Sequence, residues 1–138
     1  MSISPSLRQQ IRQEAHYCCG YCQTQERVSG IPLTMEHLIP VASGGSNLET
    51  NLWLSCRLCN EAKGTQINAV DPETGIAVPL FNPRTQSWHE HFKWDSSKTR
   101  IVGLTPIGRA TIEALQLNDE FRIASRAIWV EAGWHPPT

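Results

Sequence analysis

The sequence predicts an α+β fold built around two cysteine pairs. Cys19 and Cys22 are separated by two residues, as are Cys56 and Cys59. Between the pairs, residues 31–35 have strand character and residues 51–54 return to the core, and the second pair opens a helical stretch. We therefore expect a segment with a strand, a loop and a helix that is stapled at the cysteines, preceded by an N-terminal helix and followed by a C-terminal β-hairpin plus two helices. At 138 residues this is one ordinary domain, or a small domain with an extension.

The first element is expected to be an amphipathic helix from Pro5 to about His16. Ser4 suits the N-cap, and Pro5 suits the first helical position. Ile11 and Ala15 fall on one face, which predicts that this face packs against the core.

Composition limits the class of protein. The first ten residues lack the apolar core of a signal peptide, and no apolar run approaches the roughly 18–20 residues that span a bilayer. We therefore expect a cytoplasmic protein without membrane partners, whose thiols stay reduced. The net charge of -1 argues against coating nucleic acid by bulk charge, but it leaves room for local phosphate contacts.

Four of the five cysteines are expected to bind zinc. In a reducing compartment two C-x-x-C pairs indicate metal ligands rather than disulfides, and Gly20 permits the tight turn inside the first pair. Two such pairs can close one tetrahedral four-thiolate site from Cys19, Cys22, Cys56 and Cys59. Cys18 is the cysteine left outside the two pairs, although it could replace Cys19 as a zinc ligand. The alternatives are a redox pair or scattered core cysteines.

The segment between the pairs predicts the body of the finger. The expected order is a strand from Ile31 running into Glu36 and His37, a loop over 43–47, a return to the core over 51–54, and a helix from Cys56 to Lys63 stopped by Gly64.

The motifs in this segment resemble the HNH endonuclease family. They are C-x2-C, E-H-L-I-P, G-G, N-L-x-L-x-C and C-N-x-x-K-G, and they cover residues 19–64, about a third of the chain. The resemblance implies a ββα-metal finger and a metal-dependent endonuclease that hydrolyses DNA phosphodiester bonds. It leaves open whether the DNA is single- or double-stranded. The stretch from VPLFNPR to GLTPIGRAT also resembles an extension found on some bacterial members.

Roles follow from the resemblance position by position. His37 resembles the general base, and Glu36 resembles the acidic ligand of a catalytic divalent ion. Asn60 resembles the final motif residue and second protein ligand, and Asn51 resembles the asparagine that holds the loop and the base. The family more often has Asp at position 36 and His at position 60, so this is an HNN variant. Both positions keep oxygen donors, which suit Mg2+ or Mn2+ better than catalytic zinc.

The chemistry of these residue types agrees with that assignment. A neutral imidazole can take a proton from water near neutral pH, and a divalent ion can stabilise charge on the phosphate. Adjacent residues of a regular strand point to opposite faces, so using both Glu36 and His37 calls for a bend or a displaced ion. Two alternatives remain: a zinc-stapled binding module with a degenerate nuclease centre, and a redox protein.

Residues 67–138 are expected to form an extension packed on a nuclease domain of residues 1–66. Residues 71–75 predict a turn, and alternation over 88–94 predicts a strand that pairs with 99–104 in a β-hairpin. Two helices are expected, from Pro106 to about Leu117 and from Glu120 to about Ala132. The core candidates are Leu104, Ile107, Ile112, Leu115, Phe121, Ile128 and Trp129.

The polar face of the predicted hairpin lies in the most basic stretch of the chain. His89 and His91 could bind metal, but a polar sheet face is the simpler interpretation. The candidate contacts to the DNA backbone are Lys63, Lys93, Lys98 and Arg100.

Overall fold

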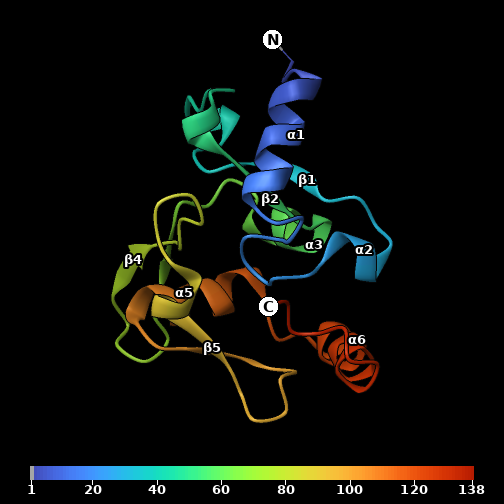
Figure 1. The fold of residues 1–138 in the computed structure, drawn as a ribbon. Helices are drawn as coiled ribbons and strands as arrows, with labels where there is room; N and C mark the ends of the chain where they lie inside the picture. The colour runs from blue at the N-terminus through green and yellow to red at the C-terminus, as the bar shows by residue number, and fades with distance from the viewer. Residues whose placement is uncertain (1) are drawn as a thin grey trace.

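The computed structural model describes residues 2–138 and confirms the α+β class (Figure 1). The helices are α1 (Pro5–Glu14), α2 (Glu26–Ser29), α3 (Arg57–Lys63), α4 (Trp88–His91), α5 (Pro106–Leu115) and α6 (Glu120–Glu131). The strands are β1 (Thr34–His37), β2 (Leu52–Ser55), β3 (Asn68–Val70), β4 (Ala77–Pro79), β5 (Phe92–Trp94) and β6 (Ile101–Gly103). Within the described residues the strands pair as three antiparallel hairpins, β1–β2, β3–β4 and β5–β6.

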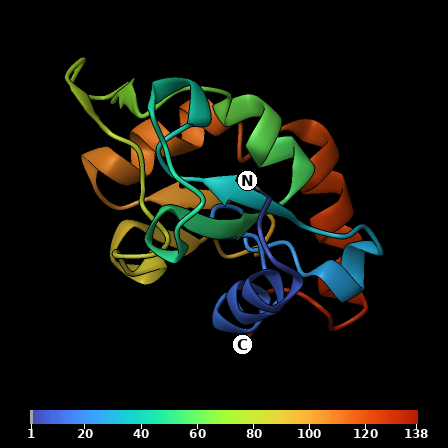
Figure 2. The same cartoon turned by 90° about the horizontal axis from the view of Figure 1, so that it is seen from above.

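The finger is the β1–β2 hairpin followed by α3. Glu36 pairs with Trp53 and His37 pairs with Leu52, so the hairpin is in regular register to the end of β1. Figure 2 shows this hairpin between α1 on one side and the layer of α3 and α5 on the other. The hairpin therefore has structure on both faces.

The loop between β1 and β2 depends on its two glycines. It contains two short 3-10 turns, η1 (Val41–Ser43) and η2 (Glu49–Asn51). Gly44 has φ of +88°, which L residues with side chains rarely adopt. A Cβ at Gly45 would collide with the carbonyl of Ile39. The Gly-Gly pair is thus required by the path of the loop.

One core joins the finger to the C-terminal half. Tyr21 and Leu54 are fully buried, and so are Phe92 and Leu115 from the later segment. The indole Nε1 of Trp88 donates a hydrogen bond of 2.8 Å to the carbonyl of Tyr21. The extension therefore contributes side chains to the same core as the cysteine pairs.

Residues 88–91 differ from the predicted strand. They form the single helical turn α4, and only residues 92–94 pair as β5 with β6. The aromatic residues nevertheless gather as expected, with Trp88 ring centroids 5.2 Å from Phe92 and 5.5 Å from Trp94. The alternating pattern thus identified the aromatic residues that pack together, but the strand it predicted over residues 88–91 is a helical turn.

The core prediction was wrong for part of the extension. Phe121 is 76% exposed and Ile128 is 65% exposed, whereas Arg122 and Arg126 are buried. Leu104 is also exposed. Helix α6 therefore turns its arginines inward, where carbonyl oxygens and sulfur accept their hydrogen bonds. Hydrophobic periodicity does not predict this orientation of the helix.

Among residues 2–138 there is no helix with both the length and the apolar character needed to cross a bilayer.

Candidate functional site

Four cysteine sulfurs converge on one point beside the finger. The ligand atoms of Cys19, Cys22, Cys56 and Cys59 all lie within 4.8 Å of one another, and the sulfurs of Cys22 and Cys56 are 3.6 Å apart. A tetrahedral zinc ion with bonds of about 2.3 Å would hold its sulfurs about 3.8 Å apart. The first pair, the second pair and their grouping are thus as predicted, and the donor set can hold a metal ion and favours zinc.

Local backbone geometry supplies both halves of this cluster. Cys19 N–H donates to the Thr24 carbonyl across the first turn, where Gln23 has a positive φ. In the second pair Cys56 is the N-cap of α3, and its sulfur accepts the N–H of Cys59. Both turns hold two sulfurs on the same side of the chain.

The cluster calls for a cation. Burial raises the pKa of Cys19 and Cys59, whereas hydrogen bonding with neighbouring cysteines lowers the pKa of Cys22 and Cys56. Four buried thiolates cannot share this space without positive charge to offset them. Metal binding would supply that charge and favour deprotonation of all four thiols.

Cys18 lies outside the cluster. Its thiol donates to the carbonyl of His16 at 3.3 Å, and burial, reinforced by the charge of Cys22, raises its pKa to about 11. Cys19, rather than Cys18, is the residue that joins the metal-binding group.

His37 stands at the end of β1 with its ring fixed by the loop. Its Nε2 lies 2.7 Å from Asn47 Oδ1. An amide oxygen only accepts hydrogen bonds, so Nε2 carries the hydrogen and the neutral ring has its lone pair on Nδ1. The ring is therefore oriented, and one nitrogen is available to take a proton.

Asn51 ties the loop to the end of β1. Its side-chain oxygen accepts the N–H of Ile39 at 2.8 Å, and its amide donates to the carbonyls of Ile39 and Ser46 at 3.0 and 2.9 Å. Ser46 precedes Asn47, the partner of His37. The buried Asn51 side chain thus fixes the segment that orients the imidazole.

Glu36 faces the opposite way, toward α3, and it already has a cation beside it. The residue is 3% exposed, and Lys63 Nζ lies 2.9 Å from its Oε1. The same ammonium donates to the carbonyls of His37 and Leu38 at 3.2 and 3.3 Å. Burial raises the pKa of Glu36, while the bond and charge of Lys63 act against that shift. Lys63 therefore ties the end of β1 to α3.

Asn60 looks onto the same face of β1. Its Nδ2 donates to Thr34 Oγ1 at 3.1 Å, and Thr34 lies two residues before Glu36 on the strand. Asn60 and Lys63 lie three residues apart on α3, so both face the hairpin. The structure thus places Glu36 and Asn60 on facing surfaces of β1 and α3, with His37 on the other side of the strand and no bend in β1.

The predicted DNA-contacting lysines and arginine do not gather around His37. Lys63 is buried in its pair with Glu36, so the prediction that it contacts a DNA phosphate from the surface was wrong. Lys93, Lys98 and Arg100 are exposed on the β5–β6 hairpin, which lies at the lower end of the view in Figure 1, whereas the β1–β2 loop lies near the top. They are remote from the candidate catalytic residues.

Comparison with known families supports the identity of the finger. Residues 19–66 match the family model described as HNH endonuclease. This segment is an HNH domain. It takes in both cysteine pairs, β1, β2 and α3, and with them each residue of the HNN series. No curated protein and no solved structure matches the chain.

Two residues that act on the HNH domain from outside it could not be identified from the sequence. Arg122 lies 63 positions from Cys59, yet its Nη1 donates to that sulfur at 3.2 Å. Asp119 holds the same guanidinium through an ion pair of 2.7 Å at Nε. An arginine on an amphipathic helix ordinarily faces solvent, and the only available hint is its spacing of four residues from Arg126.

Proposed function

We propose that this protein is a metal-dependent endonuclease that hydrolyses DNA phosphodiester bonds, with His37 as the general base. One observation carries the proposal: within an HNH domain, the His37 ring is held through Nε2 so that Nδ1 can accept a proton. Other buried polar contacts of the finger hold the backbone around His37 in place. Asn51 fixes the loop, and Lys63 binds the carbonyl of His37.

The proton step follows from the tautomer. Nδ1 would remove a proton from the attacking water as its oxygen approaches the phosphorus. The resulting imidazolium keeps its Nε2–H bond to Asn47 Oδ1, which strengthens as the ring gains charge. General-base catalysis of this kind contributes about 10²–10⁴ in rate. Asn47 and Asn51 would act as positioning residues.

Glu36 and Asn60 would hold the divalent ion, Mg2+ or Mn2+. When bound, this ion would stabilise negative charge on the phosphate and the leaving oxygen. The fit rests on two features of the site. The carboxylate and the amide supply the hard oxygen donors that these ions prefer, and Glu36 and Asn60 lie on facing surfaces of β1 and α3. The ion would replace the Lys63 ammonium, which lies 2.9 Å from Glu36 Oε1, as the partner of the carboxylate.

The four cysteines would hold a structural zinc ion that supports the finger. A reducing cytoplasm, which the sequence predicts, would keep these thiols available. We propose residues 1–66 as the nuclease unit and residues 67–138 as an extension that stabilises it. Lys93, Lys98 and Arg100 would contact the DNA backbone away from the cut.

A second function is favoured by one observation. Lys63 already neutralises Glu36 inside the fold, as in a domain whose catalytic ion has been lost. On that alternative the protein is a zinc-stapled module that binds nucleic acid or protein without cleaving it.

Plasmid cleavage separates the two functions. Wild type and His37→Ala, both with measured zinc content, would be incubated with supercoiled plasmid in EDTA, Mg2+ and Mn2+. The nuclease proposal expects nicking that requires the divalent ion and disappears in His37→Ala while zinc and fold remain. Intact plasmid, single-stranded DNA and RNA with the zinc-loaded wild type would favour the binding module.

A further inference from the structure

Each sulfur of the cysteine cluster has a hydrogen-bond donor, and one of the four donors comes from a distant part of the chain. The four contacts are Tyr21 N to Cys19 at 3.4 Å, Thr24 Oγ1 to Cys22 at 3.1 Å, Cys59 N to Cys56 at 3.4 Å, and Arg122 Nη1 to Cys59 at 3.2 Å. Three of the donors lie within three residues of the sulfur they reach. The fourth comes from α6, at the other end of the chain.

We propose that Arg122 is an outer-sphere partner of the zinc centre, through which the C-terminal helix controls how tightly the HNH domain holds its metal. The inference rests on the proposed structural zinc but not on nuclease activity. Arg122 would donate to the Cys59 thiolate and offset charge at a site that its four ligands alone leave negative.

The charge balance at the site gives Arg122 this role. A zinc ion with four thiolates carries a net charge of -2, and all four cysteines are buried. Buried charge is costly unless it is paired and hydrogen-bonded. Among the described contacts to these sulfurs, the Arg122 guanidinium is the one that brings a full positive charge. Partners of this kind orient the ligands and change metal affinity.

Arg122 is also held in place before any metal binds. Its Nε pairs with Asp119 at 2.7 Å, and its Nη2 contacts the carbonyl of Leu115 at 3.4 Å. Asp119 is at the same time the N-cap of α6, accepting the N–H groups of residues 121 and 122. The guanidinium is therefore positioned by the start of its own helix, and little conformational freedom remains to be lost on contact with sulfur.

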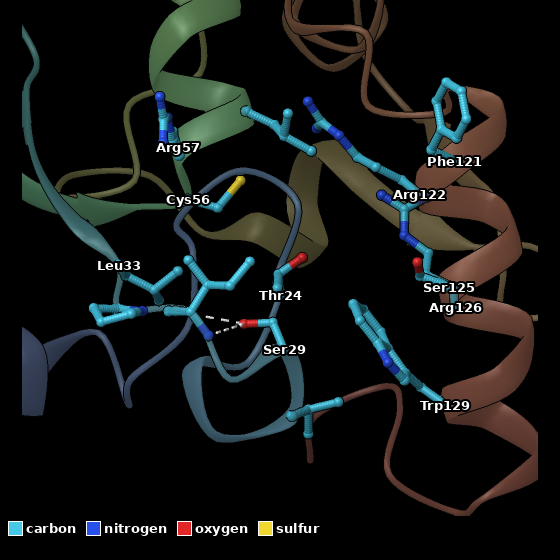
Figure 3. A pocket seen from close by; sticks show the side chains of 14 residues that line it. Thr24, Ser29, Leu33, Cys56, Arg57, Phe121, Arg122, Ser125, Arg126 and Trp129 are labelled. Carbon is cyan, nitrogen blue, oxygen red and sulfur yellow. Dashed lines mark hydrogen bonds between the residues drawn. The ribbon is translucent and has the colours of Figure 1, made fainter.

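A groove beside the cluster shows how α6 shields it. Figure 3 looks into this groove, of about 390 Å³, where Arg122 and Arg126 reach from α6 toward the side that carries Cys56. Leu33 and Thr24 lie on the side opposite α6. Arg122 and Cys56 both line the groove, so the contact to Cys59 stands next to the route by which solvent or a chelator could approach the metal.

Arg126 provides a matched control on the same helix face. It is buried more deeply than Arg122, and its guanidinium donates to the carbonyls of Thr99 and Leu117 and lies over the ring of Trp94. Its described hydrogen bonds reach oxygen and not sulfur. Arg126→Met therefore removes a buried arginine and weakens the packing of α6 without removing a donor to the cluster.

The experiment compares zinc retention in the full chain. Wild type, Arg122→Met, Arg122→Lys and Arg126→Met would be loaded with one zinc ion, and release to a coloured chelator would be timed. We expect Arg122→Met to release zinc at least about tenfold faster than wild type, because outer-sphere partners of this kind change metal affinity by about that factor or more. The rate of zinc release from Arg122→Lys should lie between those of Arg122→Met and wild type. Arg126→Met should release zinc at nearly the wild-type rate. Circular dichroism would verify that each variant is folded.

Cobalt substitution gives a readout that a purely structural role would not change. Losing a hydrogen bond to one thiolate shifts the sulfur-to-cobalt charge-transfer bands, so Arg122→Met should shift them and Arg126→Met should not. Equal zinc release and identical cobalt spectra in the two Met variants would overturn the role of Arg122. A folded wild type that binds no zinc would instead overturn the zinc assignment itself.

Discussion

The Lys63 ammonium lies 2.9 Å from Glu36 Oε1 inside the fold, where both side chains are almost fully buried. The pair joins β1 to α3 and occupies the face on which the resemblance to HNH endonucleases places a catalytic ion. Since the same ammonium also binds the carbonyls of residues 37 and 38, the pair sets both the charge of Glu36 and the position of the His37 main chain.

Removing this lysine should destabilise the protein strongly. Lys63→Met leaves the buried Glu36 carboxylate without a cation and with only the long hydrogen bond of 3.5 Å from Ser55 Oγ. Loss of the charged partner costs about 3–5 kcal/mol of unfolding free energy. Urea titration would measure the loss. The matched control is Arg57→Met, which breaks an exposed pair with Glu61 on the same helix and should leave the free energy of unfolding almost unchanged. Equal losses in the two variants would show that the Glu36–Lys63 pair is not buried in solution.

The same variant tests whether Glu36 can bind a divalent ion. Without Lys63, the carboxylate has no cation, so Mn2+ should raise the melting temperature of Lys63→Met more than that of wild type. The double variant Lys63→Met/Glu36→Gln should not respond. A response that survives in the double variant would place the ion elsewhere.

Zinc removal should unfold the finger. The segment of residues 19–66 has little apolar core of its own, so the metal supplies much of its stability. We expect Cys56→Ser, or chelation of the wild type, to lower the melting temperature and abolish stoichiometric zinc. Cys18→Ser is the control, because Cys18 is buried beside the cluster but outside it. An unchanged melting curve in Cys56→Ser would contradict a structural role for the metal.

Sequence reasoning was most successful where spacing alone determines proximity. Each C-x-x-C turn forms within a few residues, so the spacing predicted the two pairs of sulfurs, whereas the ββα finger was predicted from the resemblance to HNH endonucleases. Helix α5 was also anticipated, since Thr105 caps it and Pro106 opens it.

The contacts that sequence reasoning missed are those made between distant segments. The pattern of α6 predicted that Phe121 faces the core, whereas the helix instead turns Arg122 toward a sulfur that only the folded finger presents. Lys63 likewise looked like a surface lysine because its partner lies across the hairpin. The orientation of a buried charged side chain depends on a partner far along the chain, and the periodicity of the local sequence does not identify that partner.

Asn51 should matter more for the order of the loop than for the stability of the whole fold. Asn51→Ala removes three hydrogen bonds and leaves the carbonyl and amide groups of Ile39 unpaired, at a cost of about 1–3 kcal/mol. Native-state hydrogen exchange should show faster exchange at the Ile39 amide, whose acceptor is the Asn51 side chain. Asn68→Ala, at an exposed position of β3, serves as the control. Protection at Ile39 that is unchanged in Asn51→Ala would argue against the tie between loop and strand.

The buried imidazole of His135 should make stability depend on pH below neutrality. Burial lowers its pKa, the bond from its Nε2 to the carbonyl of Lys98 acts in the opposite direction, and the charge of Arg126 lowers the pKa further. The unfolded chain, with a histidine pKa of about 6.5, therefore binds a proton at a higher pH than the folded protein does. The contribution of His135 to stability is complete above that pH and is lost as the pH falls through the lower, folded pKa.

Urea titrations between about pH 7.5 and 5 would measure this effect. The free energy of unfolding of the wild type should fall with decreasing pH by up to about 1.4 kcal/mol per unit, the limit for one proton. His135→Gln should remove that part of the slope, so the two curves should converge as the pH falls. His89→Gln controls for the loss of an exposed imidazole. Parallel curves for wild type and His135→Gln across this range would show that His135 is not held neutral against the rings of Trp94 and Trp129.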